Sequence, residues 1–207
     1  MKKFMCTSLI VFFLICGTLQ ADWLVNCNGR QIKLFLPKIT LSAEKKVFID
    51  AFSEAYKDIP LDVLKVENLQ QFLNAAFEDE ENDFASKQAN TLFISAKDEK
   101  DRVVGFVSFD NNSDHVYIRS LSVDPEFQGY GLGKALVFCF SNVFKNCRRL
   151  KLVTRKANSC ARLFYTKIGF IESAYIHQGL SPERYIGYEY SFDDSFVEQI
   201  SSKYEVV

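Results

Sequence analysis

Three glycines at alternate positions, Gly129, Gly131 and Gly133, lie between an apolar segment at residues 116–123 and a segment with helical periodicity. The first segment has the composition of a strand, and the residues after Gly131 repeat apolar side chains at helical spacing. Glycine permits backbone angles and close approaches that other residues rarely adopt. The chain is therefore expected to turn tightly from strand to helix here, so that the amides of the three glycines and of Lys134 converge at a helix N-terminus.

This glycine-rich turn is suited to binding phosphate, because unpaired N–H groups and the helix dipole both favour negative charge. It is not a nucleotide P-loop, since three residues rather than four separate Gly129 from Gly133, and Ala135 follows the lysine. It is not a dinucleotide loop either, because position 134 is Lys and no acid lies near Lys151, about 20 residues further on. Taken alone, the glycines also fit a turn without a ligand.

The rest of the chain predicts an α/β fold with a mixed sheet and helices on both faces. Strands are expected at residues 31–36, 92–96, 103–109, 116–123, 150–153, 171–176 and 184–192. Helices are expected from Ser42 as N-cap, over residues 69–77, from Gly131, and from Asn158 to Gly169. Broken alternation at Arg119 and Ser120 predicts a β-bulge, and the acidic run 78–83 predicts a solvated loop.

Composition limits the classes of partner. The 207 residues suit one domain, and the net charge of −1 leaves no basic surplus to neutralise nucleic acid, so no nucleic acid partner is expected. The six cysteines show no spacing typical of a zinc site, so no metal is expected. Cys139 and Cys147 are expected on one helix, about two turns apart and too distant for a disulfide. The oligomeric state is not encoded in any recognisable pattern.

The N-terminus differs from the rest of the chain. Lys2 and Lys3 precede an apolar stretch at residues 4–16, and small residues lead to Ala21. This order is typical of a signal peptide, and the stretch is short for a bilayer span, which needs about 20 residues. Residues 1–21 therefore predict export, or membrane association through an uncleaved anchor. A start codon placed too early, with a cytoplasmic protein, is the alternative.

Two motifs together point to a family. Gln128, Gly131 and Gly133 form a Gln-x-x-Gly-x-Gly pattern that resembles the acetyl-coenzyme A pyrophosphate loop of the GNAT N-acetyltransferase superfamily. Residues 121–125 resemble the strand before that loop. Residues 158–170 are similar to a second family motif, in which Asn, an aromatic pair and Gly-Phe recur. The resemblance covers residues 31–192 as one N-acetyltransferase domain and leaves residues 193–207 as a C-terminal tail.

The resemblance implies a central mixed, mostly antiparallel sheet in which the strands ending near Val123 and starting near Leu150 splay apart around a pantetheine arm. It implies acetyl-coenzyme A as co-substrate and direct attack by a primary amine of a small molecule or protein. The bulge amide would polarise the thioester carbonyl. The implied cofactor-binding residues are Leu121, Ser122, Val123, Gln128, Gly129, Tyr130, Gly131, Leu132, Gly133, Lys134 and Asn158.

The resemblance also implies catalytic roles. Tyr165 matches the family's tyrosine that protonates the leaving thiolate, although its spacing equally fits a core aromatic on an amphipathic helix. Relatives often carry a glutamate on the strand before the loop or on the next strand, and residues 115–119 and 152–154 contain no carboxylate. His115 is the candidate base because its ordinary pKa is about 6.5, and a surface histidine is the alternative.

Other interpretations stay open at this stage. Glu183, Tyr185 and Glu189, near the last strand, are further candidates for the base, and water could relay the proton. The missing carboxylate leaves room for a catalytically weak GNAT-like domain that binds coenzyme A or a protein partner. A third hypothesis is an exported binding module that holds cationic partners with the acidic run 78–83.

Overall fold

A computed structural model of the chain describes residues 22–37, 40–86, 90–144, 147–193, 195 and 205–206. The signal peptide or anchor predicted at residues 1–21 lies outside these ranges, as does most of the C-terminal tail. In the part of the chain that is described, no helix has both the length and the apolar character that crossing a bilayer requires.

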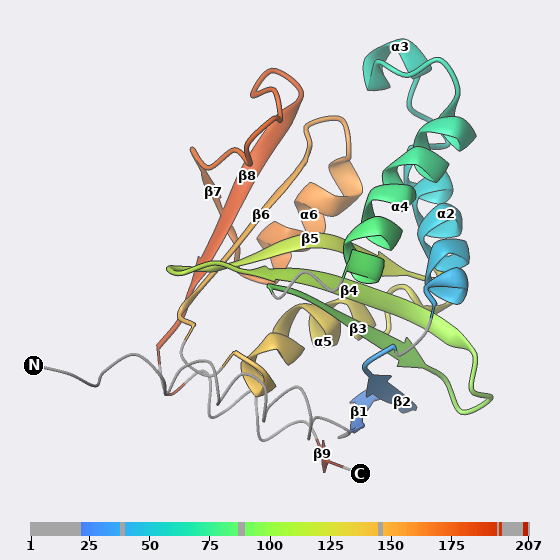
Figure 1. Ribbon diagram of the computed structural model, residues 1–207, viewed down its shortest axis with the longest axis vertical. Helices are drawn as coiled ribbons and strands as arrows, with labels where there is room; N and C mark the ends of the chain where they lie inside the picture. Colours follow the sequence, from blue (N-terminus) through green and yellow to red (C-terminus); the bar gives the residue numbers. More distant parts are fainter. Residues whose placement is uncertain are drawn as a thin grey trace, which may run out of the picture.

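The described strands form one mixed sheet (Figure 1). They are β1 (Trp23–Cys27), β2 (Arg30–Phe35), β3 (Thr91–Lys97), β4 (Val103–Asn111), β5 (Val116–Val123), β6 (Arg149–Arg155), β7 (Ile171–Ser173), β8 (Tyr185–Ser191) and β9 (Glu205–Val206). Their order across the sheet is β7-β8-β6-β5-β4-β3-β2-β1-β9. Strands β5 and β6 run parallel and the other neighbouring pairs run antiparallel, which confirms the mixed, mostly antiparallel sheet.

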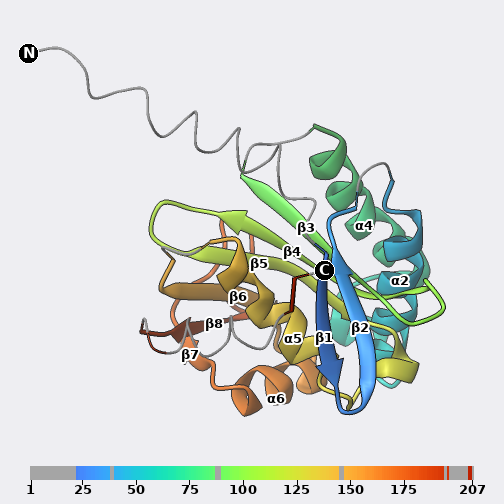
Figure 2. The same ribbon diagram turned by 90° about the horizontal axis from the view of Figure 1, so that it is seen from below.

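Helices cover both faces of the sheet, as predicted (Figures 1 and 2). The helices are α2 (Ser42–Tyr56), α3 (Leu61–Leu64), α4 (Leu69–Ser86), α5 (Leu132–Phe138) and α6 (Ser159–Lys167), with 3₁₀ turns η1 (Pro125–Phe127) and η2 (Cys139–Asn142). On one face, Phe48 of α2 and Phe77 of α4 pack together and against Phe106 of β4. On the other face, α5 and α6 share a core with Ile118 and Leu152 of the two parallel strands.

The sheet extends beyond residues 31–192 at both ends. Strand β1 pairs with β2 across a two-residue turn in which Asn28 (φ 50°) and Gly29 (φ 89°) both have positive φ. An Asn-Gly pair with these angles closes a hairpin because its twist matches that of the flanking strands. Strand β9 then pairs with β1 through Trp23 and Leu24.

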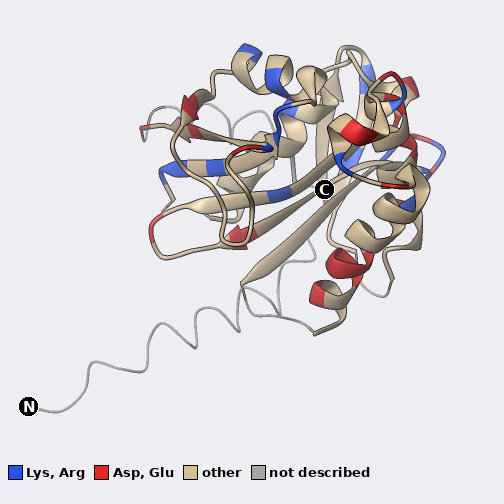
Figure 3. Cartoon of the chain, turned by 90° about the horizontal axis from the view of Figure 1, so that it is seen from above, with Lys and Arg blue, Asp and Glu red and all other residues tan. Residues whose placement is uncertain are grey.

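The prediction of a solvated loop at residues 78–83 is wrong. Helix α4 runs through the acidic run to Ser86, and Glu80 in its middle is only 6% exposed. Glu81 forms an ion pair of 3.0 Å with Lys45, and Asp83 pairs with Arg119. The run therefore contributes intramolecular contacts through Glu80, Glu81 and Asp83, whereas Glu78 and Asp79 are exposed. Elsewhere acidic and basic positions are interspersed along the chain, in keeping with the net charge of −1 (Figure 3).

Two smaller expectations are also corrected. Ser42 is the first helical residue rather than the N-cap of α2; Leu41 holds the cap position without a side-chain hydrogen bond. Cys139 and Cys147 do not share a helix, because α5 ends at Phe138 and gives way to a 3₁₀ turn. The described cysteines are free thiols, of which Cys160 is exposed and not a buried hydrophobe.

Candidate functional site

The parallel strands β5 and β6 separate partway along their length. Their ladder joins Val116–Ile118 to Leu150–Leu152 and goes no further in the described residues. Beyond it, β5 stays paired with β4 up to Val123, and β6 stays paired with β8 up to Arg155. The register of β4 and β5 shifts at this point, which confirms the bulge predicted around Arg119 and Ser120. Two strands that part between fixed neighbours leave a gap between them, as the family resemblance implied.

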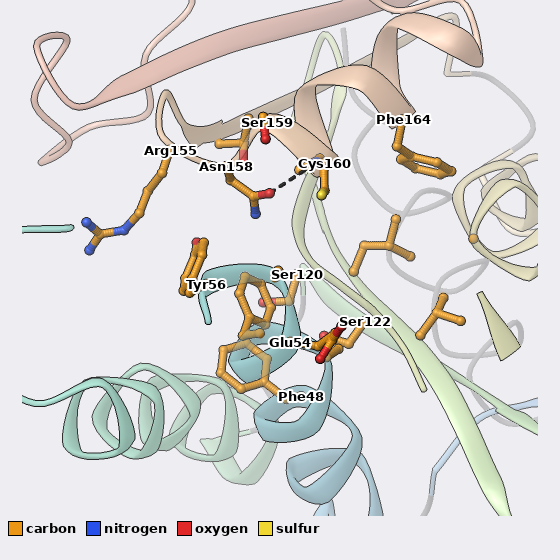
Figure 4. Close-up of a pocket in the computed structure, with 18 of the residues that line it drawn as sticks. Phe48, Glu54, Tyr56, Ser120, Ser122, Arg155, Asn158, Ser159, Cys160 and Phe164 are labelled. Atoms are coloured by element: carbon orange, nitrogen blue, oxygen red, sulfur yellow. Dashed lines mark hydrogen bonds between the residues drawn. The ribbon is translucent and has the colours of Figure 1, made fainter. Parts of the chain in front are cut away.

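A cavity of about 720 Å³ occupies this gap. Its floor is the diverging ends of β5 and β6, and its walls come from the C-terminal half of α2, from α4 and from the start of α6. Figure 4 shows Arg155 and Tyr56 at one side of the cavity and Phe164 at the opposite side, with Asn158 and Cys160 between them. The volume is in the range of small-molecule and cofactor sites.

The glycine-rich turn closes the Phe164 side of the cavity. Gly129 (φ 80°) and Gly131 (φ 89°) are left-handed, and a Cβ on either would meet no atom within 4 Å. Gly133 has a different role, because its Cβ would lie 3.2 Å from the Phe164 ring. Gly131 is the N-cap of α5, so the first-turn amides have no acceptor within the helix. The turn therefore combines backbone donors with open space around two of its glycines.

Most of the predicted site residues lie together. Those that line the cavity are Leu121, Ser122, Val123, Gln128, Gly129, Gly133, Asn158 and Tyr165. Gly131 caps the helix beside it, and Lys134 is exposed on the first turn. Leu132 is a core residue at 1% exposure, and the Tyr130 ring lies under the Arg30 guanidinium at 3.9 Å. Gln128 supports the turn by donating from Nε2 to the Val123 carbonyl at 3.1 Å.

His115 does not reach the cavity. It lies just before β5, at the end of that strand away from Val123, where its Nδ1 is 2.7 Å from Asp114 Oδ1 and its ring contacts Tyr175. Glu183 and Glu189 are likewise absent from the cavity lining, whereas Tyr185 is part of it. The geometry therefore brings neither His115 nor the two glutamates to the reacting end of the gap.

One buried serine at the cavity has no partner. Ser122 is 2% exposed, and no described group forms a hydrogen bond with its Oγ. The residue lies on the part of β5 that has lost its β6 neighbour. A buried polar atom without a partner costs free energy in the unliganded protein. This hydroxyl is therefore available to a bound molecule.

A carboxylate that the sequence reasoning missed lies behind the bulge. Glu80 of α4 accepts hydrogen bonds from Ser120 Oγ at 2.7 Å and from Ser108 Oγ at 2.9 Å, and Arg119 Nε is 3.6 Å away. Burial raises the pKa of Glu80, and the Arg119 charge and the two hydroxyls oppose that rise. Ser120 lines the cavity, so one hydroxyl connects this carboxylate to it.

A signal for Glu80 was present in the sequence. The buried positions Leu73, Phe77 and Glu80 follow helical spacing, and Phe84 continues the same face. Extending the predicted helix through the acidic run would have put Glu80 on the inner face. The prediction of a loop at residues 78–83 relied on their charge, whereas the helical spacing of the apolar residues on either side matches the observed helix.

The cavity lining also contains Asn158 at the start of α6, Tyr165 within α6 and Tyr56 at the end of α2. Asn158 is the N-cap of α6 and accepts a hydrogen bond from the Ala161 amide at 3.0 Å, at the position where the sequence predicted that a helix begins. Burial raises the pKa of Tyr165, and the nearby Tyr56 adds to the rise. Burial also raises the pKa of Tyr56, against the opposing effects of Arg155 and Asn158. Both phenols therefore remain protonated donors through the neutral range.

In the described residues, no group of three or more His, Cys, Asp and Glu side chains is arranged so that it could hold a metal ion.

The splayed strands, the glycine turn and the flanking helices define an acetyltransferase fold. Residues 50–170, more than half of the chain, match the acetyltransferase (GNAT) family, and the chain belongs to that family.

Among individual relatives, the chain is 32% identical over 90 residues to an uncharacterized N-acetyltransferase of Methanocaldococcus jannaschii. That match covers 42% of this chain and spans only 56% of the relative.

Solved structures share the fold over a longer stretch. The PaiA N-acetyltransferase of Thermoplasma acidophilum, solved in complex with coenzyme A, superimposes with a TM-score of 0.62 at 18% identity, covering 77% of this chain and 99% of that one. A GNAT-family acetyltransferase of Staphylococcus aureus Mu50 gives a TM-score of 0.54 at 18% identity, covering 78% and 99%. At these identities the likeness concerns the fold.

Proposed function

We propose that the chain is an acetyl-coenzyme A-dependent N-acetyltransferase that acts on a primary amine. The observation that carries the proposal is the cavity formed by the parted strands, with the glycine turn at one side and both Tyr165 and Ser120 in its lining. Family membership and the coenzyme A in the Thermoplasma PaiA structure support the same donor. We propose this activity, and an amine-bearing small molecule or protein as the acceptor, for the whole protein.

The residues present fit the coenzyme. The open space around Gly129 and Gly131 leaves room for a diphosphate against the backbone amides of the turn. The β6-facing edge of β5 past Ile118 is free to pair with an extended pantetheine arm, and the unpartnered Ser122 hydroxyl lies along it. Phe164, beside Gly133, limits the turn on the α6 side. Bound there, acetyl-coenzyme A supplies an acetyl thioester.

The chain's own residues then handle two protons. The acceptor nitrogen forms a bond to the acetyl carbon while the carbon–sulfur bond breaks. Tyr165 donates its phenolic proton to the leaving sulfur, and burial keeps that proton in place until it is needed. Amides of the bulge at Arg119 and Ser120 hold the carbonyl oxygen as charge develops on it.

The other proton leaves the attacking nitrogen through Ser120. Its Oγ accepts the proton from the amine and passes its own to Glu80, to which it is already hydrogen-bonded. The raised pKa of Glu80 makes the carboxylate a better proton acceptor than an exposed glutamate. Glu80 thus takes the role of general base, for which His115 is wrongly placed because it lies at the far end of β5.

A thiol-release assay tests the function. Purified protein is mixed with acetyl-coenzyme A and a panel of amines, and free coenzyme A thiol is followed with a chromogenic disulfide. The proposal expects release that requires both the protein and a primary amine. Saturable coenzyme binding without thiol release for any amine or N-terminal peptide would instead support a non-catalytic GNAT-like binding domain.

A further inference from the structure

A buried cation lies at the side of the cavity away from the glycine turn. Arg155, the last residue of β6, is 7% exposed and lines the cavity (Figure 4). Its Nη1 donates to the Leu64 carbonyl at 2.5 Å, which ties it to the end of α3. Its guanidinium lies 4.7 Å from the centre of the Phe72 ring and 5.4 Å from that of Tyr185. The side chain is therefore held in place by one hydrogen bond and two rings.

No carboxylate neutralises this cation within the described part of the chain. Ion pairs in this structure have N···O distances of 4.0 Å or less, and among the described residues no carboxylate oxygen forms such a pair with Arg155. The acidic residues that line the cavity are Glu54 and Asp58, both exposed, and Glu54 is paired with Lys57 at 2.6 Å. Buried charges are normally paired, because removing a charge from water is costly. Arg155 thus has capacity for an anionic partner from outside the chain.

The position of Arg155 assigns that partner to the acceptor. The glycine turn lies beside Phe164, and Figure 4 places Arg155 on the opposite side of the cavity. Tyr56 lies on the same side of the cavity as Arg155 (Figure 4), and it lines the same cavity as Tyr165. An anion at Arg155 would therefore lie in the same cavity as Tyr165, on the side away from the glycine turn that would hold the diphosphate of the donor.

We propose that the acceptor carries a carboxylate beside its amine, bound by the Arg155 guanidinium and the Tyr56 hydroxyl, so that amino acids or short carboxylate-bearing amines are the substrate class. The inference rests on the proposed acetyl transfer. A planar guanidinium matches a carboxylate through two parallel N–H···O bonds, whereas an ammonium group would not. The Phe72 and Tyr185 rings hold the guanidinium in place through cation–π contacts.

The test measures product binding, which does not require turnover. Coenzyme A-loaded protein is titrated calorimetrically with an N-acetylated amino acid, its uncharged carboxamide and the N-acetyl alkylamine that lacks the carboxyl group. The charged compound is expected to bind roughly 10- to 100-fold more tightly than either neutral one, as for a hydrogen bond to a charged group. The matching N-acetyl aminoalkylphosphonate distinguishes a carboxylate site from a general anion site, and it should bind more weakly than the carboxylate.

Variants separate recognition from packing. Arg155→Gln should remove the preference for the charged compound, Arg155→Lys should keep only part of it, and Tyr56→Phe should reduce it several-fold. Coenzyme A affinity should be unchanged in all three. Equal binding of charged and neutral compounds by the wild-type protein would overturn the inference without any variant, even if thiol release confirms the acetyl transfer. Conversely, a carboxylate preference in a protein that releases no thiol would refute the catalytic proposal and keep the site.

Discussion

Ser120 Oγ donates a 2.7 Å hydrogen bond to Oε1 of Glu80, and this bond connects the cavity to a carboxylate buried beneath α4. Ser108 donates to the other carboxylate oxygen at 2.9 Å, so Glu80 is fixed from two strands. The serine sits on the bulge of β5, where the sheet opens. Bulge, hydroxyl and carboxylate together provide both the shape of the site and a path for a proton.

Glu80→Gln is expected to lower kcat by roughly 10²- to 10⁴-fold, the usual contribution of a general base. The base must be ionised, and burial holds its pKa above the ordinary value of about 4.3. The wild-type rate should therefore fall on the acid side at a pH above that value, and the Gln variant should lack this limb. Measuring kcat against pH checks both, and Glu78→Gln, on the exposed face of α4, is the control.

The same variant has an expected effect on stability. Because the folded-state pKa of Glu80 is raised, its stabilising contribution is full at low pH and is lost as pH rises through that pKa. Glu80→Gln avoids this loss, so its free energy of unfolding should improve relative to wild type as pH increases. A variant with wild-type kcat and an unchanged acid limb would remove Glu80 from the proton path.

Tyr165→Phe should slow turnover by a similar factor while leaving the Kd for acetyl-coenzyme A nearly unchanged, because only the proton donor to sulfur is lost. Steady-state kinetics and calorimetry measure the two quantities. Tyr188→Phe is the matched control: its ring lies 6.0 Å from that of Tyr165, but its hydroxyl faces Glu172 outside the cavity. Equal rates for wild type and Tyr165→Phe would make Tyr165 a packing residue.

Gly131→Asp should weaken acetyl-coenzyme A binding roughly 10-fold or more, because it puts a carboxylate beside the diphosphate. Gly179→Asp is the control, since Gly179 has a similar φ of 86° and equally open surroundings but lies in the connection between β7 and β8 and not in the glycine-rich turn. Asp tolerates the left-handed conformation better than most residues, so both variants are expected to fold. If both variants lose the same affinity for acetyl-coenzyme A, or if neither loses any, the glycine-rich turn does not bind the coenzyme.

Asn158 has two roles that its substitutions can separate. Asn158→Ala removes the cap on the Ala161 amide and should cost about 1 kcal/mol of stability. Asn158→Asp keeps the cap and loses the amide donor at the cavity, so it should retain stability but bind coenzyme less tightly. Denaturant unfolding and calorimetry give both values. An Asp variant with wild-type affinity would leave Asn158 as a helix cap alone.

Residues 1–21 carry a prediction that protein chemistry can check. If they are a cleaved signal peptide, N-terminal sequencing of the protein from its natural source should begin at Asp22. A natural chain that starts at Met1 would contradict cleavage and leave an anchor or a cytoplasmic protein.

The sequence was most informative where local rules decide the structure. The alternate glycines set the strand-to-helix turn, Asn158 caps its helix, and Gly169 ends it with a φ of 102°. It was least informative where long-range contacts decide. The burial of Glu80 depends on two serines from different strands, 28 and 40 residues away. Arg155 gives no local sign of being buried, because its partners are the Leu64 carbonyl and rings from α4 and β8.

A crystal structure of the protein with coenzyme A would show directly whether the glycine turn and the gap hold the donor. We expect the diphosphate on the amides of residues 129–134, the pantetheine arm between β5 and β6, and the sulfur near the Tyr165 hydroxyl. Coenzyme bound outside the gap between these strands, or a turn that contacts no phosphate, would contradict this expectation.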